Sequence, residues 1–130
     1  MTPRYGAHHP HALRVFVVEN HVDTRESLCM LLQSFGHTVL SADTMAQALQ
    51  LLPHGDCDVL ISDIGLPDGN GWELLRQVRL PRPIYAIAMS GYGMKADRER
   101  SLAAGYQHHL VKPMAPEQIE RILEQVEPTH

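Results

Sequence analysis

The sequence predicts a single α/β domain in which a parallel sheet carries helices on both faces. At 130 residues the chain is long enough to bury one core. Five short apolar runs alternate with segments of helical periodicity, which is the pattern of successive βαβ units. The runs are almost continuously apolar, as expected for strands that are covered on both faces.

The five predicted strands are apolar runs that end at polar residues; they span residues 13–18, 37–41, 59–62, 84–89 and 108–111. The predicted helices carry apolar residues at a spacing of three and four; they span residues 23–35, 44–52, 72–79, 95–104 and 116–126. Right-handed crossovers between parallel strands restrict how these units can be arranged.

Several residues mark where the helices begin and end. Asp23 followed by Glu26 resembles a capping box, and Gly36 tolerates the positive φ that ends a helix. Thr44 is a predicted N-cap and Pro53 a predicted helix end. Pro116 suits the first turn of the last helix.

Composition narrows the function classes. The net charge of −4 gives no basic surface, so direct nucleic-acid binding is not expected. No apolar run approaches the roughly 20 residues that span a bilayer, and the N-terminus lacks the apolar centre of a signal peptide. Cys29 and Cys57 share no motif spacing and are predicted to be reduced, which favours a cytoplasmic location.

The predicted organisation has three parts. Residues 1–12 form a flexible N-terminal arm, residues 13–127 form the domain, and residues 128–130 form a short tail. The arm contains His8, His9 and His11, which could bind metal, but a flexible polar terminus is the favoured interpretation. No second domain is expected, so the chain is either a stand-alone protein or a domain of a larger one.

Polar residues follow the predicted strands. Glu19 and Asn20 follow the first strand, Asp63 the third, Ser90 the fourth and Lys112 the fifth. Taken alone, Asp63 could equally cap a turn. Together these groups are expected to meet beyond the carboxyl ends of the strands, where ligands bind in α/β sheets. Such oxygen ligands suit Mg²⁺, and a carboxylate can attack phosphorus while Lys offsets the phosphoryl charge.

Four motifs in this order resemble the receiver domains of two-component response regulators over residues 13–127. They are Val-Val-Glu-Asn at 17–20, Leu-Ile-Ser-Asp-Ile-Gly-Leu-Pro-Asp-Gly-Asn-Gly at 60–71, Met-Ser-Gly-Tyr-Gly at 89–93 and Leu-Val-Lys-Pro at 110–113. The resemblance implies a flavodoxin-like (βα)5 domain with strand order 2-1-3-4-5.

The resemblance also implies roles for individual residues. Asp63 is the expected phosphate acceptor, Ser90 the switch hydroxyl and Lys112 the lysine typical of the family, with a cis bond between Lys112 and Pro113. The metal, Mg²⁺ or alternatively Mn²⁺, is expected on Glu19, Asn20, Asp63 and the backbone carbonyl of Gly65.

Two residues depart from the family pattern. Asn20 stands where a second acid is usual, which predicts weaker Mg²⁺ binding because one negative charge is missing. His109 stands where a Tyr or Phe often switches between inward and outward positions. It could serve as such a switch and titrate near neutral pH, or it could be a strand-end His without that role.

Other notable residues have ordinary structural interpretations. Trp72 is predicted to pack the start of its helix, and Asp68 is predicted to be a loop residue and not a second acidic site. Tyr92 and Gly65 would lie near the phosphorus in the family, but loop packing explains them equally well. The charged residues 95–100 are predicted to be a solvated helix face, which the resemblance would make part of the output surface.

The implied function is a signalling switch. Asp63 would take a phosphoryl group from a histidine kinase or a histidine phosphotransfer protein, and the altered output surface would bind an unknown partner or form a phosphorylation-dependent dimer. Self-phosphorylation from acyl phosphates and slow dephosphorylation are expected, not conventional turnover. One alternative is a pseudo-receiver that binds proteins without phosphorylation, supported only by Asn20. Another is a phosphohydrolase, disfavoured because Gly65 stands where its second acid would be needed and no cap is encoded.

Overall fold

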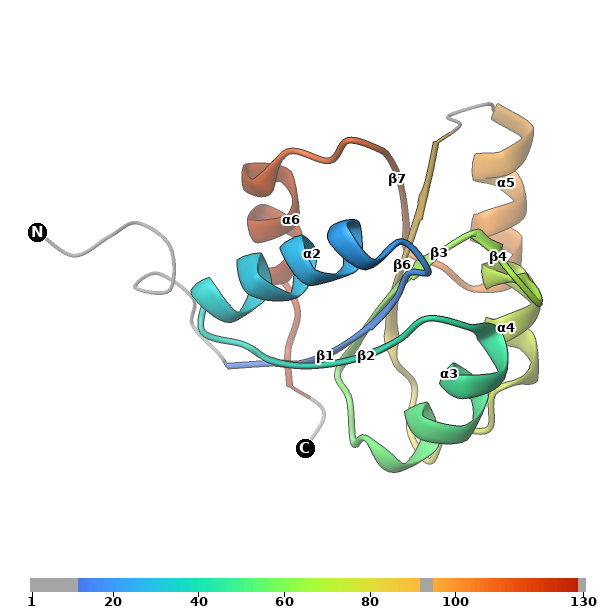
Figure 1. The fold of residues 1–130 in the computed structure, drawn as a ribbon, viewed down its shortest axis with the longest axis horizontal. Helices are drawn as coiled ribbons and strands as arrows, with labels where there is room; N and C mark the ends of the chain where they lie inside the picture. Colours follow the sequence, from blue (N-terminus) through green and yellow to red (C-terminus); the bar gives the residue numbers. More distant parts are fainter. Residues whose placement is uncertain (1–11, 92–94, 129–130) are drawn as a thin grey trace, which may run out of the picture.

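The computed structural model describes residues 12–91 and 95–128, which fold around a five-stranded sheet (Figure 1). All neighbouring strands are parallel. In spatial order they are β2 (Thr38–Ala42), β1 (Arg14–Val18), β3 (Val59–Asp63), β6 (Tyr85–Ser90) and β7 (His108–Val111). Counted in chain order among the sheet strands, this is 2-1-3-4-5, so the predicted topology is confirmed.

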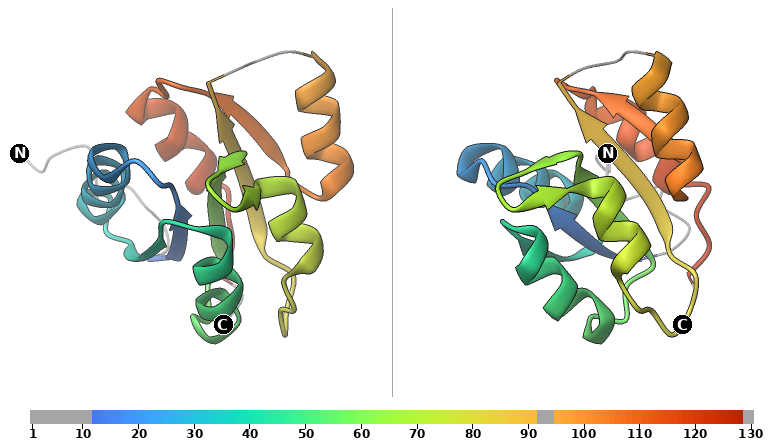
Figure 2. Two further views of the ribbon diagram at one scale, coloured as in Figure 1. Left: turned by 45° about the vertical axis from the view of Figure 1, so that its right-hand side comes forward. Right: turned by 90° about the vertical axis from the view of Figure 1, so that its right-hand side faces the viewer.

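Helices cover both faces of the sheet, as Figures 1 and 2 show. One face carries α2 (Val22–Ser34) and α6 (Pro116–Leu123), and the other carries α3 (Met45–Leu51), α4 (Gly71–Gln77) and α5 (Lys95–Ala104). The strand side chains alternate between these layers: Val59 and Ile61 pack with α2 and α6, whereas Leu60 packs with α3 and α4. This two-sided burial explains why the three central strands β1, β3 and β6 are largely apolar.

Most of the predicted helix ends are confirmed. Gly36 follows the C-cap of α2 with φ at 98°, where a side chain would be strained. Thr44 caps α3, since its side chain accepts a hydrogen bond of 3.1 Å from the backbone N–H of Gln47. Pro116 lies in the first turn of α6.

The predicted capping box at Asp23 is wrong. The helix already begins at Val22, and its N-cap His21 makes no side-chain capping bond. Asp23 lies inside the first turn, where its negative charge still suits the positive end of the helix dipole.

Other boundaries differ by a few residues. The helix predicted to end at Pro53 ends at Leu51, because residues 52–54 tighten into the 3-10 helix η1 (Leu52–His54). The helix predicted for 72–79 spans 71–77. The second strand begins one residue late because the N–H of His37 bonds the carbonyl of Leu32 and so closes α2.

A small hairpin after β3 was not predicted. It consists of β4 (Gly65–Leu66) and β5 (Gly69–Asn70), which pair antiparallel beside the end of β3. Two-residue strands of Gly, Leu and Asn carry no alternating pattern, so only the folded chain reveals them.

Trp72 is 92% buried at the start of α4, so its predicted packing role is confirmed. Both cysteines are free thiols, as predicted. Within 12–91 and 95–128, no helix has the length and apolarity to cross a bilayer. Residues 1–11 of the predicted arm, with their three His, lie outside the described residues, as do Tyr92 and residues 129–130.

Candidate functional site: a carboxylate–lysine cluster at the sheet edge

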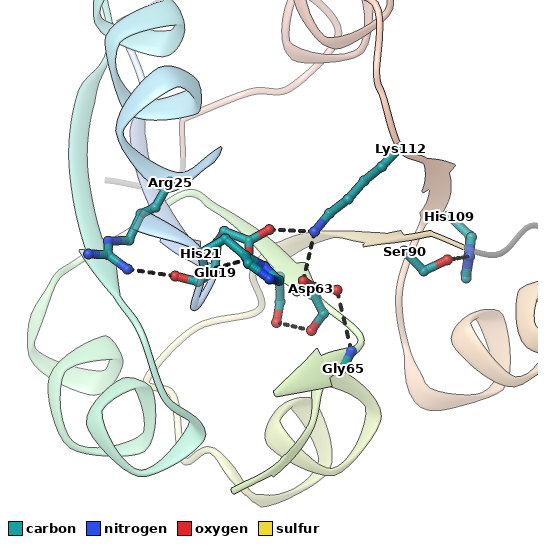
Figure 3. Close-up of polar contacts among 9 residues, drawn as sticks. Glu19, His21, Arg25, Asp63, Gly65, Ser90, His109 and Lys112 are labelled. Carbon is teal, nitrogen blue, oxygen red and sulfur yellow. Dashed lines mark hydrogen bonds and ion pairs between the residues drawn. The ribbon is translucent and has the colours of Figure 1, made fainter. Parts of the chain in front are cut away.

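The predicted site residues meet at one edge of the sheet because they follow parallel strands (Figure 3). Glu19 follows β1 and Asp63 ends β3, while Ser90 ends β6 and Lys112 follows β7. Most side chains of the central strands are apolar and buried between the helix layers, so the charged groups of the site lie at the strand ends.

Lys112 joins two carboxylates. Its Nζ donates hydrogen bonds of 2.5 Å to Oε1 of Glu19 and 2.8 Å to Oδ2 of Asp63 (Figure 3). Glu19 is fully buried and Asp63 is 7% exposed, so the charge of Lys112 compensates for the hydration that both carboxylates lose. The cluster therefore holds two carboxylates against a single ammonium.

The surroundings shift the pKa values of the two carboxylates in opposite directions. Burial raises the pKa of Asp63 above its ordinary value and the charge of Glu19 adds to the rise, although Lys112 and the N–H of Gly65, 3.3 Å from Oδ1, oppose it. Burial also acts to raise the pKa of Glu19, but hydrogen bonds from Lys112 and His21 outweigh it and lower that pKa. The cluster thus favours protonation of Asp63, and ionisation of Glu19, more than water does.

Lys112 stays charged in this setting. Burial alone would lower the pKa of its ammonium group, but the hydrogen bonds to Asp63 and Glu19 outweigh burial and raise that pKa. A fixed positive charge beside Asp63 suits chemistry on an anionic substrate.

The donor set fits Mg²⁺. The described residues contain no cluster of three or more His, Cys, Asp or Glu side chains arranged to hold a metal. Mg²⁺ does not need one, because it keeps several waters and takes only one or two carboxylates. Glu19 and Asp63 supply those carboxylates with one ammonium between them, so the cluster keeps an excess of negative charge. Asn20 and the carbonyl of Gly65 would add neutral oxygens.

Two residues that sequence reasoning missed hold Glu19 in place. His21 donates from its backbone N–H to Oε2 of Glu19 at 3.0 Å, and its ring Nδ1 lies 3.2 Å from the same oxygen. Arg25 donates to the backbone carbonyl of Glu19 at 2.9 Å (Figure 3). Closeness in sequence could have indicated these contacts, since His21 is two residues after Glu19 and Arg25 is one helical turn further.

Ser90 belongs to a second group of contacts. Its hydroxyl lies 2.9 Å from Nε2 of His109 and points toward that ring, not toward Asp63 (Figure 3). Nδ1 of His109 lies 2.7 Å from Oγ of Ser101, which also accepts a bond of 2.9 Å from the indole N–H of Trp72. Sequence reasoning missed Ser101, because one Ser in a charged helix carries no signal.

Residues from both groups line one cavity of about 490 Å³, which is large enough for a phosphoryl group and ordered water. The residues lining it include Asp63, Lys112, Ser90, His109, Trp72 and Asp97. The Lys112–Pro113 bond that follows β7 is cis.

Asp68 lies outside this cavity in the turn of the β4–β5 hairpin. Its carboxylate accepts hydrogen bonds of 2.7 Å and 2.9 Å from the backbone N–H groups of Met45 and Ala46, and it thereby caps α3 across 22 residues of sequence. The sequence predicted a loop residue, and the structure adds a tertiary cap.

The family model described as the response regulator receiver domain matches residues 15–124. The chain is similar to an uncharacterised 14.6 kDa protein in the sodA1 3′ region of Leptolyngbya boryana, with 34% identity over 85% of this chain and 87% of that protein. It is also 33% identical to the transcriptional regulatory protein CusR of Escherichia coli K12, over 79% of this chain and 46% of CusR, so it spans about half the length of that relative.

A solved structure is also similar. It is the receiver domain of the sensor histidine kinase PA1611 from Pseudomonas aeruginosa PAO1, with a magnesium ion coordinated in its active-site cleft. The two share 25% identity with a TM-score of 0.79, over 89% of this chain and 98% of that one. Sequence family, strand order and fold likeness agree, and the chain belongs to the response regulator receiver domains of two-component systems.

Proposed function

We propose that this receiver domain is a phospho-acceptor switch in which Asp63 takes a phosphoryl group from a histidine kinase or a histidine phosphotransfer protein. The observation that carries the proposal is the contact of Lys112 with both Glu19 and Asp63. It places a persistent positive charge beside the carboxylate of Asp63 in the lining of one cavity, and joins both to the buried carboxylate of Glu19.

The transfer step is a displacement at phosphorus. A carboxylate oxygen of Asp63 forms a bond to phosphorus while the bond from phosphorus to the donor imidazole nitrogen, or to an acyl oxygen, breaks. Lys112 pairs with the phosphoryl oxygens as charge gathers on them. Mg²⁺ held by Glu19, Asp63, Asn20 and the Gly65 carbonyl would supply the remaining positive charge. The magnesium ion in the active-site cleft of the PA1611 receiver domain supports this choice of ion.

The test is phosphorylation by a small acyl phosphate, with and without Mg²⁺, measured by intact mass. We expect one phosphate adduct on the wild type that needs Mg²⁺, and none on Asp63→Asn. Asp68→Asn is the matched control, because it changes an aspartate of the same loop that lies outside the cavity. A wild type without adduct at high Mg²⁺ would favour the pseudo-receiver, which binds partners without phosphorylation.

Asn20 provides a separate prediction. Because its amide lacks the charge of an acid, Asn20→Asp should bind Mg²⁺ more tightly, by roughly tenfold or ~1.4 kcal/mol. Isothermal titration of Mg²⁺ into both proteins would measure the change. Equal affinities would show that the missing charge has no effect on the ion.

A further inference from the structure

A line of hydrogen bonds runs from α4 through α5 to Ser90, outside the carboxylate–lysine cluster. The indole N–H of Trp72 donates to Oγ of Ser101, Oγ of Ser101 lies 2.7 Å from Nδ1 of His109, and Nε2 of His109 lies 2.9 Å from Oγ of Ser90. These residues come from α4, α5, β7 and β6.

The direction of these bonds follows from the chemistry of Ser101. Its side chain is fully buried, so its hydroxyl hydrogen needs an acceptor inside the protein. Trp72 cannot be that acceptor, because an indole nitrogen only donates. Among the described residues, the other group in contact with this hydroxyl is Nδ1 of His109. Ser101 therefore donates to Nδ1, and a neutral His109 carries its proton on Nε2.

This assignment determines how Ser90 is bonded. Because Nε2 of His109 is a donor, Oγ of Ser90 accepts from it at 2.9 Å. The hydroxyl hydrogen of Ser90 is then not used on His109 and points elsewhere. Accepting one bond also strengthens a hydroxyl as the donor of another.

We propose that Ser101 is a positioning residue that fixes His109 as its Nε2–H tautomer and thereby presents the hydroxyl of Ser90 as a hydrogen-bond donor to the phosphoryl group. The role of Ser90 as a donor rests on the proposed function, since it requires a phosphoryl group on Asp63. The tautomer of His109 concerns only the unphosphorylated protein. A strand-end His with no role at the site would need neither the contact with Ser101 nor the contact with Ser90.

The first measurement needs no phosphate donor. Side-chain ¹⁵N spectra of His109 at neutral-imidazole pH distinguish a protonated Nε2 from a protonated Nδ1. We expect a single tautomer protonated on Nε2 in the wild type and a shift of the proton toward Nδ1 in Ser101→Ala. A wild-type proton on Nδ1 would overturn the assignment without any variant, so the test survives if Ser101→Ala does not fold.

Two control variants isolate the cause. His108→Gln changes the neighbouring imidazole, whose Nε2 contacts the hydroxyl of Tyr85 at 2.8 Å, and should leave the His109 tautomer unchanged. Trp72→Phe removes the indole donor but leaves the Ser101 hydrogen with the same acceptor, so the tautomer should again be unchanged. A tautomer that moved in either control as it does in Ser101→Ala would contradict the role of Ser101.

The second measurement is the fraction of protein phosphorylated at a fixed acyl-phosphate concentration. Loss of about one hydrogen bond to the phosphoryl group should lower the ratio of phosphorylated to free protein about fivefold in Ser101→Ala, and leave it unchanged in His108→Gln. An unchanged ratio in a protein whose tautomer has moved would overturn the coupling to the site. A wild type that takes no phosphate would overturn the proposed function. The tautomer measurement would still test whether Ser101 fixes the proton of His109 on Nε2.

Discussion

At the scale of single residues, two glycines of the same loop have opposite surroundings. A Cβ on Gly71 would lie 2.7 Å from the backbone carbonyl oxygen of Asp63 and 3.2 Å from the hydroxyl of Tyr106. A Cβ on Gly65 would meet nothing within 4 Å. Gly71 is therefore required by the close approach of α4 to the end of β3, whereas Gly65 is required by no such contact.

Gly71→Ala should consequently destabilise the protein by about 2 kcal/mol, since overpacking displaces the backbone that carries Asp63. Its phosphate uptake should fall as well. Gly65→Ala keeps the backbone carbonyl and should change stability by less than about 0.5 kcal/mol. Urea unfolding of both variants measures this, and equal losses would contradict the close-packing argument.

Cys57 gives a pH dependence at the same scale. Burial raises the pKa of this thiol from 9.0 to about 11, so the unfolded chain loses the proton at lower pH than the folded one. Its contribution to stability is present below pH 9 and is lost as the pH rises toward 11. The wild type should lose ~2 kcal/mol more over this range than Cys57→Ala, measured by urea unfolding. Parallel curves would show that other groups cause the alkaline loss.

At the scale of secondary structure elements, the β4–β5 hairpin and α3 are held together by Asp68. The carboxylate bonds two N–H groups at the start of α3, and these bonds hold the pKa of Asp68 below its ordinary value. The same hairpin begins at Gly65, whose N–H contacts Asp63. The cap therefore links the loop of the site to a helix on the outer layer.

Asp68→Ala should lower the melting temperature by about 3 °C, because the first turn of α3 loses its tertiary cap. The lowered pKa means that this stabilisation is present above the unfolded pKa and is lost as the pH falls through the folded one. The two melting curves should therefore converge in acid. Asp43→Ala, an exposed acid before the same helix, is the control and should melt like the wild type.

At the scale of the whole molecule, Lys112 connects the ends of three strands. It follows β7 and contacts Glu19 after β1 and Asp63 at the end of β3, so one ammonium group offsets repulsion across most of the sheet edge. Without it, two buried carboxylates would face each other with no opposite charge.

Lys112→Met should therefore reduce the free energy of unfolding by about 2 kcal/mol at neutral pH. The deficit should shrink as the pH falls through the pKa of Asp63, which burial raises and which loss of Lys112 would raise further, because protonation removes the repulsion. Lys95→Met, which removes an exposed lysine 3.9 Å from Glu99, should change stability by less than about 0.5 kcal/mol. A deficit independent of pH would mean that lost packing, not charge, causes the effect.

The sheet and most residues of the site could be predicted from the sequence. Apolar runs that end at Glu19, Asp63, Ser90 and Lys112, in alternation with helical segments, indicated buried strands with polar groups at their carboxyl ends, and parallel pairing brings those ends together. Gly36 and Thr44 indicated helix boundaries because their effects are local. Helix-boundary signals of this kind depend on residues a few positions away, so they can be recognised in the sequence without the folded structure.

Contacts between side chains of separate helices and strands could not be predicted from the sequence. Asp68 lies 22 residues after Ala46, whose N–H it caps, and Ser101 lies 29 residues after Trp72, whose indole N–H it accepts. The two-residue hairpin strands and the start of α2 at Val22 also escaped the sequence pattern. The physical reason is that hydrogen bonds between side chains depend on distance and angle in space, and a spacing along the chain encodes neither once the contact joins separate elements.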